Sequence, residues 1–315
     1  MTDTAARHAA PSEQSTPPSA APSPSGGQSP RDARRSRAPW RRSTRSVLRH
    51  TGLILFAVLM LYPLLWMVSS SLKPDALIFR ETGLIPNTVD WGNYTGGWDA
   101  LASPFGRYML NSAIVVAGSL VGNLLTCSMA AYAFARLQFR GRKWFFAIML
   151  LTIMLPIHVI IVPQYVMFSQ LDLINTFWPL ILPKLLATDA FFIFLMVQFF
   201  RGIPRELDDA ARIDGCGHVR IYAQIMMPLA VPALATTAIF TFIWTWNDFF
   251  SQLIFLTKPE MYTVPIALSA FLDSTGESSW GSMFAMSVVS LVPIFLVFLF
   301  GQKYLVKGIA TTGIK

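Results

Sequence analysis

The stretch TGLILFAVLMLYPLLWMVSSS, residues 51–71, decides the fold class of this chain, because it contains no charged residue. An α-helix rises 1.5 Å per residue, so about 20 apolar residues are enough to cross the roughly 30 Å hydrocarbon core of a bilayer. The length and composition of this stretch therefore predict a helix that spans a membrane.

The rest of the chain repeats this pattern. Of its 315 residues, 53% are hydrophobic and only 13% are charged, which is about half the charge of an average soluble domain. Five further apolar runs follow the first, and none alternates with the period of two that membrane-spanning strands require. These runs are residues 108–135, 144–168, 178–200, 227–256 and 282–304. We therefore expect an all-α polytopic membrane protein with six transmembrane helices.

The basic residues predict the orientation of these spans. The net charge is +8, and nine of the 25 basic residues lie within residues 1–50. With the N-terminus inside, twenty of the 25 fall in the tail, the two inner loops and the C-terminal end. Cytoplasmic segments carry such an excess of Lys and Arg. We expect both termini in the cytoplasm, a six-span domain at residues 47–306 and a C-terminal tail at 307–315.

Residues 1–46 have the Pro- and Ser-rich composition of a disordered tail. Arg34-Arg35 and Arg41-Arg42 raise the alternative of a twin-arginine export signal. The following apolar run is long enough to span, and no small-residue cleavage site follows it, which favours an uncleaved cytoplasmic tail. Few aromatic residues accompany the arginines, so nucleic acid is not an expected partner.

Sequence motifs for catalysis or metal binding are missing. The two cysteines and four histidines are scattered, and no HExxH, GxxxxGK[ST], GxGxxG or GxSxG motif occurs. We expect no enzyme activity, no catalytic residue, no metal site and no cofactor in this chain.

The most informative loop is RGIPRELDDAARIDGCGHVRIYAQIMMPLAVP, residues 201–232. Pro204 suits the first position of a helix, and three acids follow in its first turn, where the helix dipole favours them. Gly215 can end that helix in the left-handed conformation. A second short helix is expected from about Gly217 to Met226, before Pro228 opens the fifth span. The sequence thus predicts two short cytoplasmic helices between spans four and five.

The small side chains of Ala210 and Ala211 would let another backbone come close to this loop, and the acids around them offer charge partners. A docking surface for a cytoplasmic protein and a solvated connector with ordinary caps both fit this spacing.

This loop resembles the EAA loop of permease subunits in binding-protein-dependent ABC importers. The resemblance rests on Asp209-Ala210-Ala211, Asp214-Gly215 and Ile225-Met226-Met227-Pro228, with Asp209 in place of glutamate and Met227 in place of leucine. It extends over residues 47–315 through AAYAFARLQFRGRKW (130–144), WNDF (246–249) and YLVKGIATTGIK (304–315). The best match is the carbohydrate-uptake type, similar to the maltose-type second permease subunit.

The resemblance implies a permease that imports a sugar or oligosaccharide across the plasma membrane of a bacterium. It implies a second permease subunit as heterodimer partner, two cytoplasmic ATPase subunits that bind ATP and Mg, and an extracytoplasmic binding protein. The ATPases would dock on a coupling loop, residues 201–228. Its implied coupling residues are Glu206, Asp209, Ala210, Ala211, Asp214, Gly215, Ile225 and Pro228.

Two alternatives concern the transported solute and its driving force. The same architecture could import a polyamine or a phosphate-type solute. A stand-alone secondary transporter would need paired ionisable residues deep in its spans, and only Asp189 and Asp248 are candidates.

Candidate residues for a translocation path lie in the fifth span. Asn247 and Asp248 are expected near its outer half, as a polar lining or as a structural hydrogen bond. Trp244 and Trp246 could stack on sugar rings or serve packing. Lys184 and Asp189, expected near the outer end of the fourth span, could pair with each other.

Overall fold

The computed structural model describes residues 39–272 and 279–312, and their side chains over residues 46–272 and 279–304. Every regular element in these ranges is a helix, and neither range contains a strand. The chain divides into two compact units, one up to Leu59 and one from Met60 onward, which are described separately.

Most helices follow one another through short connections, whereas residues 79–91 form a longer connection between α2 and α3. The α-helices are α1 Pro39–Ser70, α2 Asp75–Ile78, α3 Gly92–Asp99, α4 Phe105–Gly122, α5 Ser128–Arg136, α6 Arg142–Thr152, α7 Ile157–Gln170, α8 Trp178–Leu185, α9 Ala190–Gly202, α10 Glu206–Ile213, α11 His218–Ile221, α12 Met227–Leu229, α13 Val231–Trp246, α14 Phe250–Phe255, α15 Val264–Ala270 and α16 Trp280–Thr312. Two π-helical turns, η2 Asn123–Cys127 and η3 Tyr222–Met226, and a 3₁₀ turn, η4 Pro259–Met261, complete the list.

The ends of the chain differ from the expected domain boundaries. Helix α1 begins at Pro39, so residues 39–46 of the expected disordered tail are helical, while the prediction for residues 1–38 lies outside the described residues. Helix α16 continues past residue 306 to Thr312, which makes the first part of the expected C-terminal tail helical as well.

Four stretches are long and apolar enough to cross a membrane, and two bent helix pairs raise the count to six if each pair is one span. The four are Ser46–Ser70, Phe105–Arg136, Trp178–Gly202 and Trp280–Tyr304. In the pairs, α6 and α7 meet at 100°, and the run His218–Leu229 meets α13 at 77°. The chain is therefore an all-helical protein with four to six candidate spans.

Prolines account for both bends. Pro156 directly precedes α7, and a proline disfavours helical geometry at the residue before it. Pro228 and Pro232 flank Ala230, where α12 gives way to α13. Pro163, by contrast, lies within α7 without ending the helix.

The fourth predicted span coincides with the apolar stretch Trp178–Gly202, and the third coincides with the bent pair α6–α7, whereas the fifth is corrected. Helix α13 ends at Trp246, ten residues before the expected end of the span at Leu256. Asn247–Phe249 interrupt the run, and the separate short helix α14 follows. The break falls at Asn247 and Asp248, which are the first amide and charged side chains of the run 227–256.

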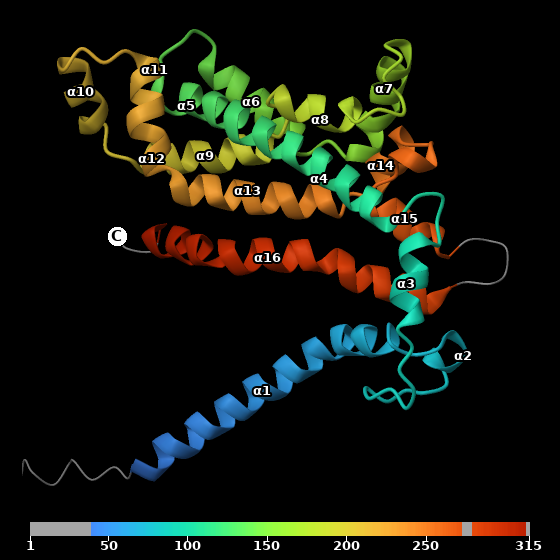
Figure 1. Ribbon diagram of the computed structural model, residues 1–315. Helices are drawn as coiled ribbons and strands as arrows, with labels where there is room; N and C mark the ends of the chain where they lie inside the picture. The colour runs from blue at the N-terminus through green and yellow to red at the C-terminus, as the bar shows by residue number, and fades with distance from the viewer. Residues whose placement is uncertain (1–38, 273–278, 313–315) are drawn as a thin grey trace, which may run out of the picture. The chain divides into compact units, whose positions relative to one another are not determined.

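Three clusters of buried apolar side chains hold the second unit together, and Figure 1 shows the helices that supply them. Helix α5 packs against α9, α4 against α8, and α13 against both α4 and α16. Gly122 permits the close approach of α4 to α8, because a Cβ atom there would lie 2.7 Å from the carbonyl carbon of Lys184.

Helices α10, α11 and α12 gather at one end of this second unit, where α5 and α16 also end, whereas α14 and α15 lie at the opposite end (Figure 1). The loop 201–228 therefore sits beyond the ends of the spans.

Candidate functional site

Helix α10 is the first element of the loop 201–228. Its first turn carries Glu206, Asp208 and Asp209, next to the exposed N–H groups that acids stabilise. Arg205 occupies the N-cap, so the helix starts two residues after Pro204, which was expected at the first helical position.

Gly215 ends the first helix of the loop through a Schellman motif. Its φ of +78° confirms the expected left-handed conformation. The Gly215 N–H donates to the Arg212 carbonyl at 3.0 Å, and the Cys216 N–H donates to the Ala211 carbonyl at 2.9 Å. These two bonds fix the angle at which the chain leaves α10.

The second half of the loop is a continuous helical run, from His218 through the π-turn η3 to Leu229. It begins one residue after the expected start at Gly217 and extends beyond the expected end at Met226. Pro228 lies inside α12 instead of opening the fifth span, which begins with α13.

A buried ion pair ties α10 to the end of the second span. Arg136 Nη1 lies 3.3 Å from Asp208 Oδ2, and the two side chains are only 2% and 8% exposed. Arg136 Nη2 also donates to the carbonyls of Phe200 and Ile203, at 2.7 and 2.6 Å. One guanidinium therefore holds α5, the end of α9 and α10 together.

The second helical run has its own anchor on α5. The hydroxyl groups of Tyr222 and Ser128 share a hydrogen bond of 2.7 Å, and the rings of Tyr222 and Tyr132 lie 5.4 Å apart. Ile221 and Met226 are buried in the same cluster, and Ile225 packs against it. Both halves of the loop thus rest on the helices below them.

The two alanines of the motif point to different sides. Ala211 is buried against the cluster beneath α10, so the close approach that its size permits is to this chain itself. Ala210 is exposed, as are Glu206 and Asp214. Asp209 is exposed too and lies 3.6 Å from Arg212 within the same helix.

Two apolar side chains stand out on the exposed side of the loop. Ile213 is 87% exposed and Val219 is 82% exposed, on either side of the Gly215 turn. Together with Ala210, Asp209 and Glu206 they form what we call the outer face of the loop. Apolar side chains rimmed by charges are typical of a protein–protein contact.

Sequence reasoning missed Arg136, Asp208 and Ile213. Asp208 had been taken only as one of three first-turn acids. The spacing of the sequence does indicate that Asp208 lies on the buried side of the helix. Asp208 and Ala211 are three residues apart and so share a helix face, whereas Asp209 lies on another face. The spacing alone could not identify Arg136 as the partner of Asp208.

The candidate path residues do not form one cluster. Trp246 is 4% exposed and stacks on Phe242 with ring centroids 5.5 Å apart, which places it in the core. Trp244 is 49% exposed, beside Phe191 and Phe192. Of the tryptophans at these two positions, only Trp244 has an exposed side chain.

Asn247 and Asp248 lie in the break that follows α13. The Asn247 side chain donates to the Ile243 carbonyl at 2.8 Å, and the Asp248 carboxylate accepts the Ser251 N–H at 3.1 Å. Asp248 thus supports the start of α14. Both side chains are at least partly exposed.

Lys184 and Asp189 do pair, at 2.8 Å, but not near the outer end of the fourth span. They bridge the break between α8 and α9, near the middle of Trp178–Gly202. The fully buried Asn123 donates to Asp189 at 2.7 Å and to Thr241 at 3.1 Å. A polar network thus crosses three spans, and such networks inside a membrane often accompany a substrate pathway.

Comparison with known proteins agrees with this architecture. Residues 122–311 match the family described as binding-protein-dependent transport system inner membrane component. The chain is 36% identical over 263 residues to the probable ABC transporter permease protein YurM of Bacillus subtilis, covering 84% of this chain and 86% of that protein.

Two further relatives carry sugar names. The arabinooligosaccharides transport system permease protein AraQ of Halalkalibacterium halodurans is 34% identical, with 84% of this chain and 94% of that protein covered. The trehalose/maltose transport system permease protein MalG of Thermococcus litoralis is 31% identical, with 85% and 96% covered.

A solved structure shares the fold. A chain of a bacterial ABC transporter involved in the import of the acidic polysaccharide alginate superimposes with a TM-score of 0.74 at 25% identity. The match covers 85% of this chain and 98% of that one.

Proposed function

Because the chain belongs to the family of inner membrane components of binding-protein-dependent transport systems, we propose that it forms half of the pathway of an ABC importer for a sugar or oligosaccharide. It is a multi-pass membrane permease and not an enzyme. The names of the AraQ and MalG relatives support a carbohydrate as the solute.

The outer face of the loop carries the coupling part of the proposal. Two ATPase subunits bind ATP and Mg, and one of them docks on Ile213, Val219 and the acids beside them. The supporting observation is that these apolar side chains are exposed while the reverse side of α10 is anchored by Arg136. An anchored helix passes on a rigid-body movement of its partner, which a flexible loop would absorb.

The remaining partners follow from the family. A second permease subunit completes the pathway as a heterodimer, and a binding protein outside a bacterial plasma membrane delivers the sugar. Both termini of this chain lie in the cytoplasm, as the distribution of Lys and Arg favours. Trp244, Asn247 and Asp248 are the proposed contacts with the solute, while Trp246 supports them from the core.

Uptake into proteoliposomes tests this proposal. The complete complex is reconstituted with ATP trapped inside, and the binding protein, loaded with the sugar that mass spectrometry identifies in it, is added outside. We expect the sugar to accumulate only with ATP inside. Accumulation driven by an ion gradient without ATP would instead identify a secondary transporter.

A further inference from the structure

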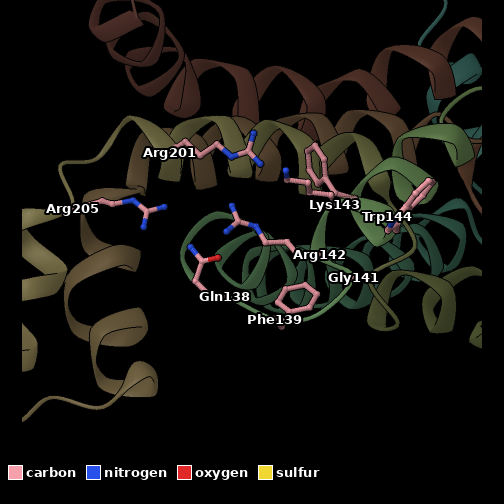
Figure 2. A pocket seen from close by; sticks show the side chains of 9 residues that line it. Gln138, Phe139, Gly141, Arg142, Lys143, Trp144, Arg201 and Arg205 are labelled. Carbon is pink, nitrogen blue, oxygen red and sulfur yellow. The ribbon is translucent and has the colours of Figure 1, made fainter.

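A basic cavity of ≈ 710 Å³ opens beside the coupling loop, where the connection from α5 to α6 meets the end of α9. We call it the basic pocket and define it by Arg142, Lys143, Trp144, Arg201 and Arg205. Figure 2 shows the guanidinium groups of Arg142, Arg201 and Arg205 directed into the same space.

The four positive charges of the basic pocket lack an acidic partner. No carboxylate lines the cavity, and none of the four cations forms an ion pair within the described part of the chain. Arg142 donates to the Leu137 carbonyl at 3.1 Å, and Arg201 lies 5.0 Å from the ring centroid of Phe146. Neither contact neutralises charge, so the pocket attracts an anion.

The pocket lies where two candidate membrane-spanning segments have their ends. The bent pair α6–α7 begins at Arg142, and the span Trp178–Gly202 ends beside Arg201. Helix α6 then exposes Trp144, Ile148 and Leu151, by 77%, 56% and 61%. An exposed tryptophan at the start of an apolar helix face is typical of the interface between headgroups and acyl chains.

We propose that the basic pocket binds a phosphate group, supplied by an anionic membrane phospholipid whose acyl chains lie along the exposed face of α6. Guanidinium groups match phosphate oxygens with two parallel hydrogen bonds, and Lys143 adds a point charge. Basic pockets at the ends of membrane helices bind such headgroups. Because Arg205 directly precedes α10, a bound lipid screens the charge beside the coupling loop.

Lysine reactivity in the complete complex tests this proposal without any substitution. The complex is placed in nanodiscs of phosphatidylcholine, with or without phosphatidylglycerol, and an amine reagent modifies exposed lysines, which are then quantified by peptide mass spectrometry. Lys258 is exposed outside the pocket and serves as the internal reference. We expect phosphatidylglycerol to lower modification of Lys143 several-fold relative to Lys258. Equal modification in both kinds of nanodisc would overturn the proposal.

A second arm separates the two sources of phosphate. Inorganic phosphate at millimolar concentration is added to the phosphatidylcholine nanodiscs. We expect it to leave Lys143 reactive, because the lipid gains additional binding from its acyl chains. Protection by inorganic phosphate equal to that by phosphatidylglycerol would overturn the assignment to a lipid.

Matched variants locate the effect in the pocket. Arg142→Gln/Arg205→Gln removes two lining charges, and Arg80→Gln/Arg140→Gln removes two exposed charges that do not line the cavity. Each basic residue near an anionic surface contributes about fivefold to binding, so the pocket variant should need roughly 25-fold more phosphatidylglycerol for the same protection. The control variant should lose less than the pocket variant, because neither of its residues lines the cavity. An equal loss in both variants would mean general surface attraction and would contradict a built site.

Discussion

Gly215 turns the loop 201–228 from α10 into the helical run that follows. At its φ of +78° a β-branched side chain is strained, although no atom lies within 4 Å of where its Cβ would stand. Gly217, two residues on, has ordinary backbone angles and equally open surroundings. The two glycines therefore differ in backbone conformation and not in space.

Gly215→Val should strain the turn by about 1–2 kcal/mol and tilt α10 against the helical run that follows. We expect weaker co-purification of the ATPase subunit and slower uptake, while insertion into the membrane is unchanged. Gly217→Val adds the same side chain without the strain, so co-purification of the ATPase subunit and uptake should both stay close to wild type. Equal defects in the two variants would point to the bulk of valine and away from the turn.

Disrupting the buried ion pair Arg136–Asp208 should lower the stability of the protein far more than disrupting the exposed pair Asp209–Arg212. Removing one partner of a buried ion pair costs about 3–5 kcal/mol, and Arg136→Met also deprives two carbonyls of their donor. We expect Arg136→Met to lower thermal stability more than Asp208→Asn, and Arg136→Met/Asp208→Leu to recover part of the loss. Thermal unfolding of the purified complex measures all three.

Asp209→Ala is the control for that series. Asp209 and Arg212 are largely exposed and 3.6 Å apart, and such pairs contribute under about 1 kcal/mol. Stability should therefore change little. A loss as large as that of Arg136→Met would show that burial does not distinguish the two pairs.

At the scale of elements, the two bent pairs decide the topology. If α6 and α7 together form one span, the residues before and after the pair lie on opposite sides of the membrane. If the pair turns back instead, those residues lie on the same side. The same alternatives apply to the run His218–Leu229 with α13.

Single cysteines, introduced after Cys127 and Cys216 are replaced, distinguish these arrangements. We expect an impermeant reagent outside intact cells to label Asp172→Cys and Lys258→Cys, and to miss Arg140→Cys and Arg220→Cys. All four positions are exposed in the structure. Labelling of neither Arg140→Cys nor Asp172→Cys would show that α6 and α7 form a re-entrant hairpin that returns to the cytoplasmic side.

For the molecule as a whole, the features that could be predicted from the sequence are those that depend on residues close together in the chain. Apolar runs placed the helices, and Gly215 after a helical stretch predicted the left-handed turn that the structure confirms. The presence of a proline does not by itself locate a bend, because Pro156 precedes the bend between α6 and α7 while Pro163 lies within α7 without ending the helix.

Contacts between residues that lie far apart in the chain could not be predicted from the sequence. The partner of Asp208 is 72 residues away at Arg136, and the network of Asn123 joins three separate spans. Trp244 and Trp246 lie two residues apart in the same expected span, yet only the packing of α13 against α4 and α16 shows that Trp246 is buried. Hydrophobicity alone does not distinguish an apolar side chain that faces lipid from one that is buried in the protein core.

Photo-crosslinking in cells can show whether an ATPase subunit docks on the outer face of the loop. A photoreactive amino acid replaces Ile213, which is 87% exposed, or Ile85, which is 86% exposed in the predicted external loop between the first two spans. In cells that express the whole importer, the probe at position 213 should crosslink to the ATPase subunit and the probe at position 85 should not. A crosslink from position 85 to the ATPase, or none from position 213, would contradict the account.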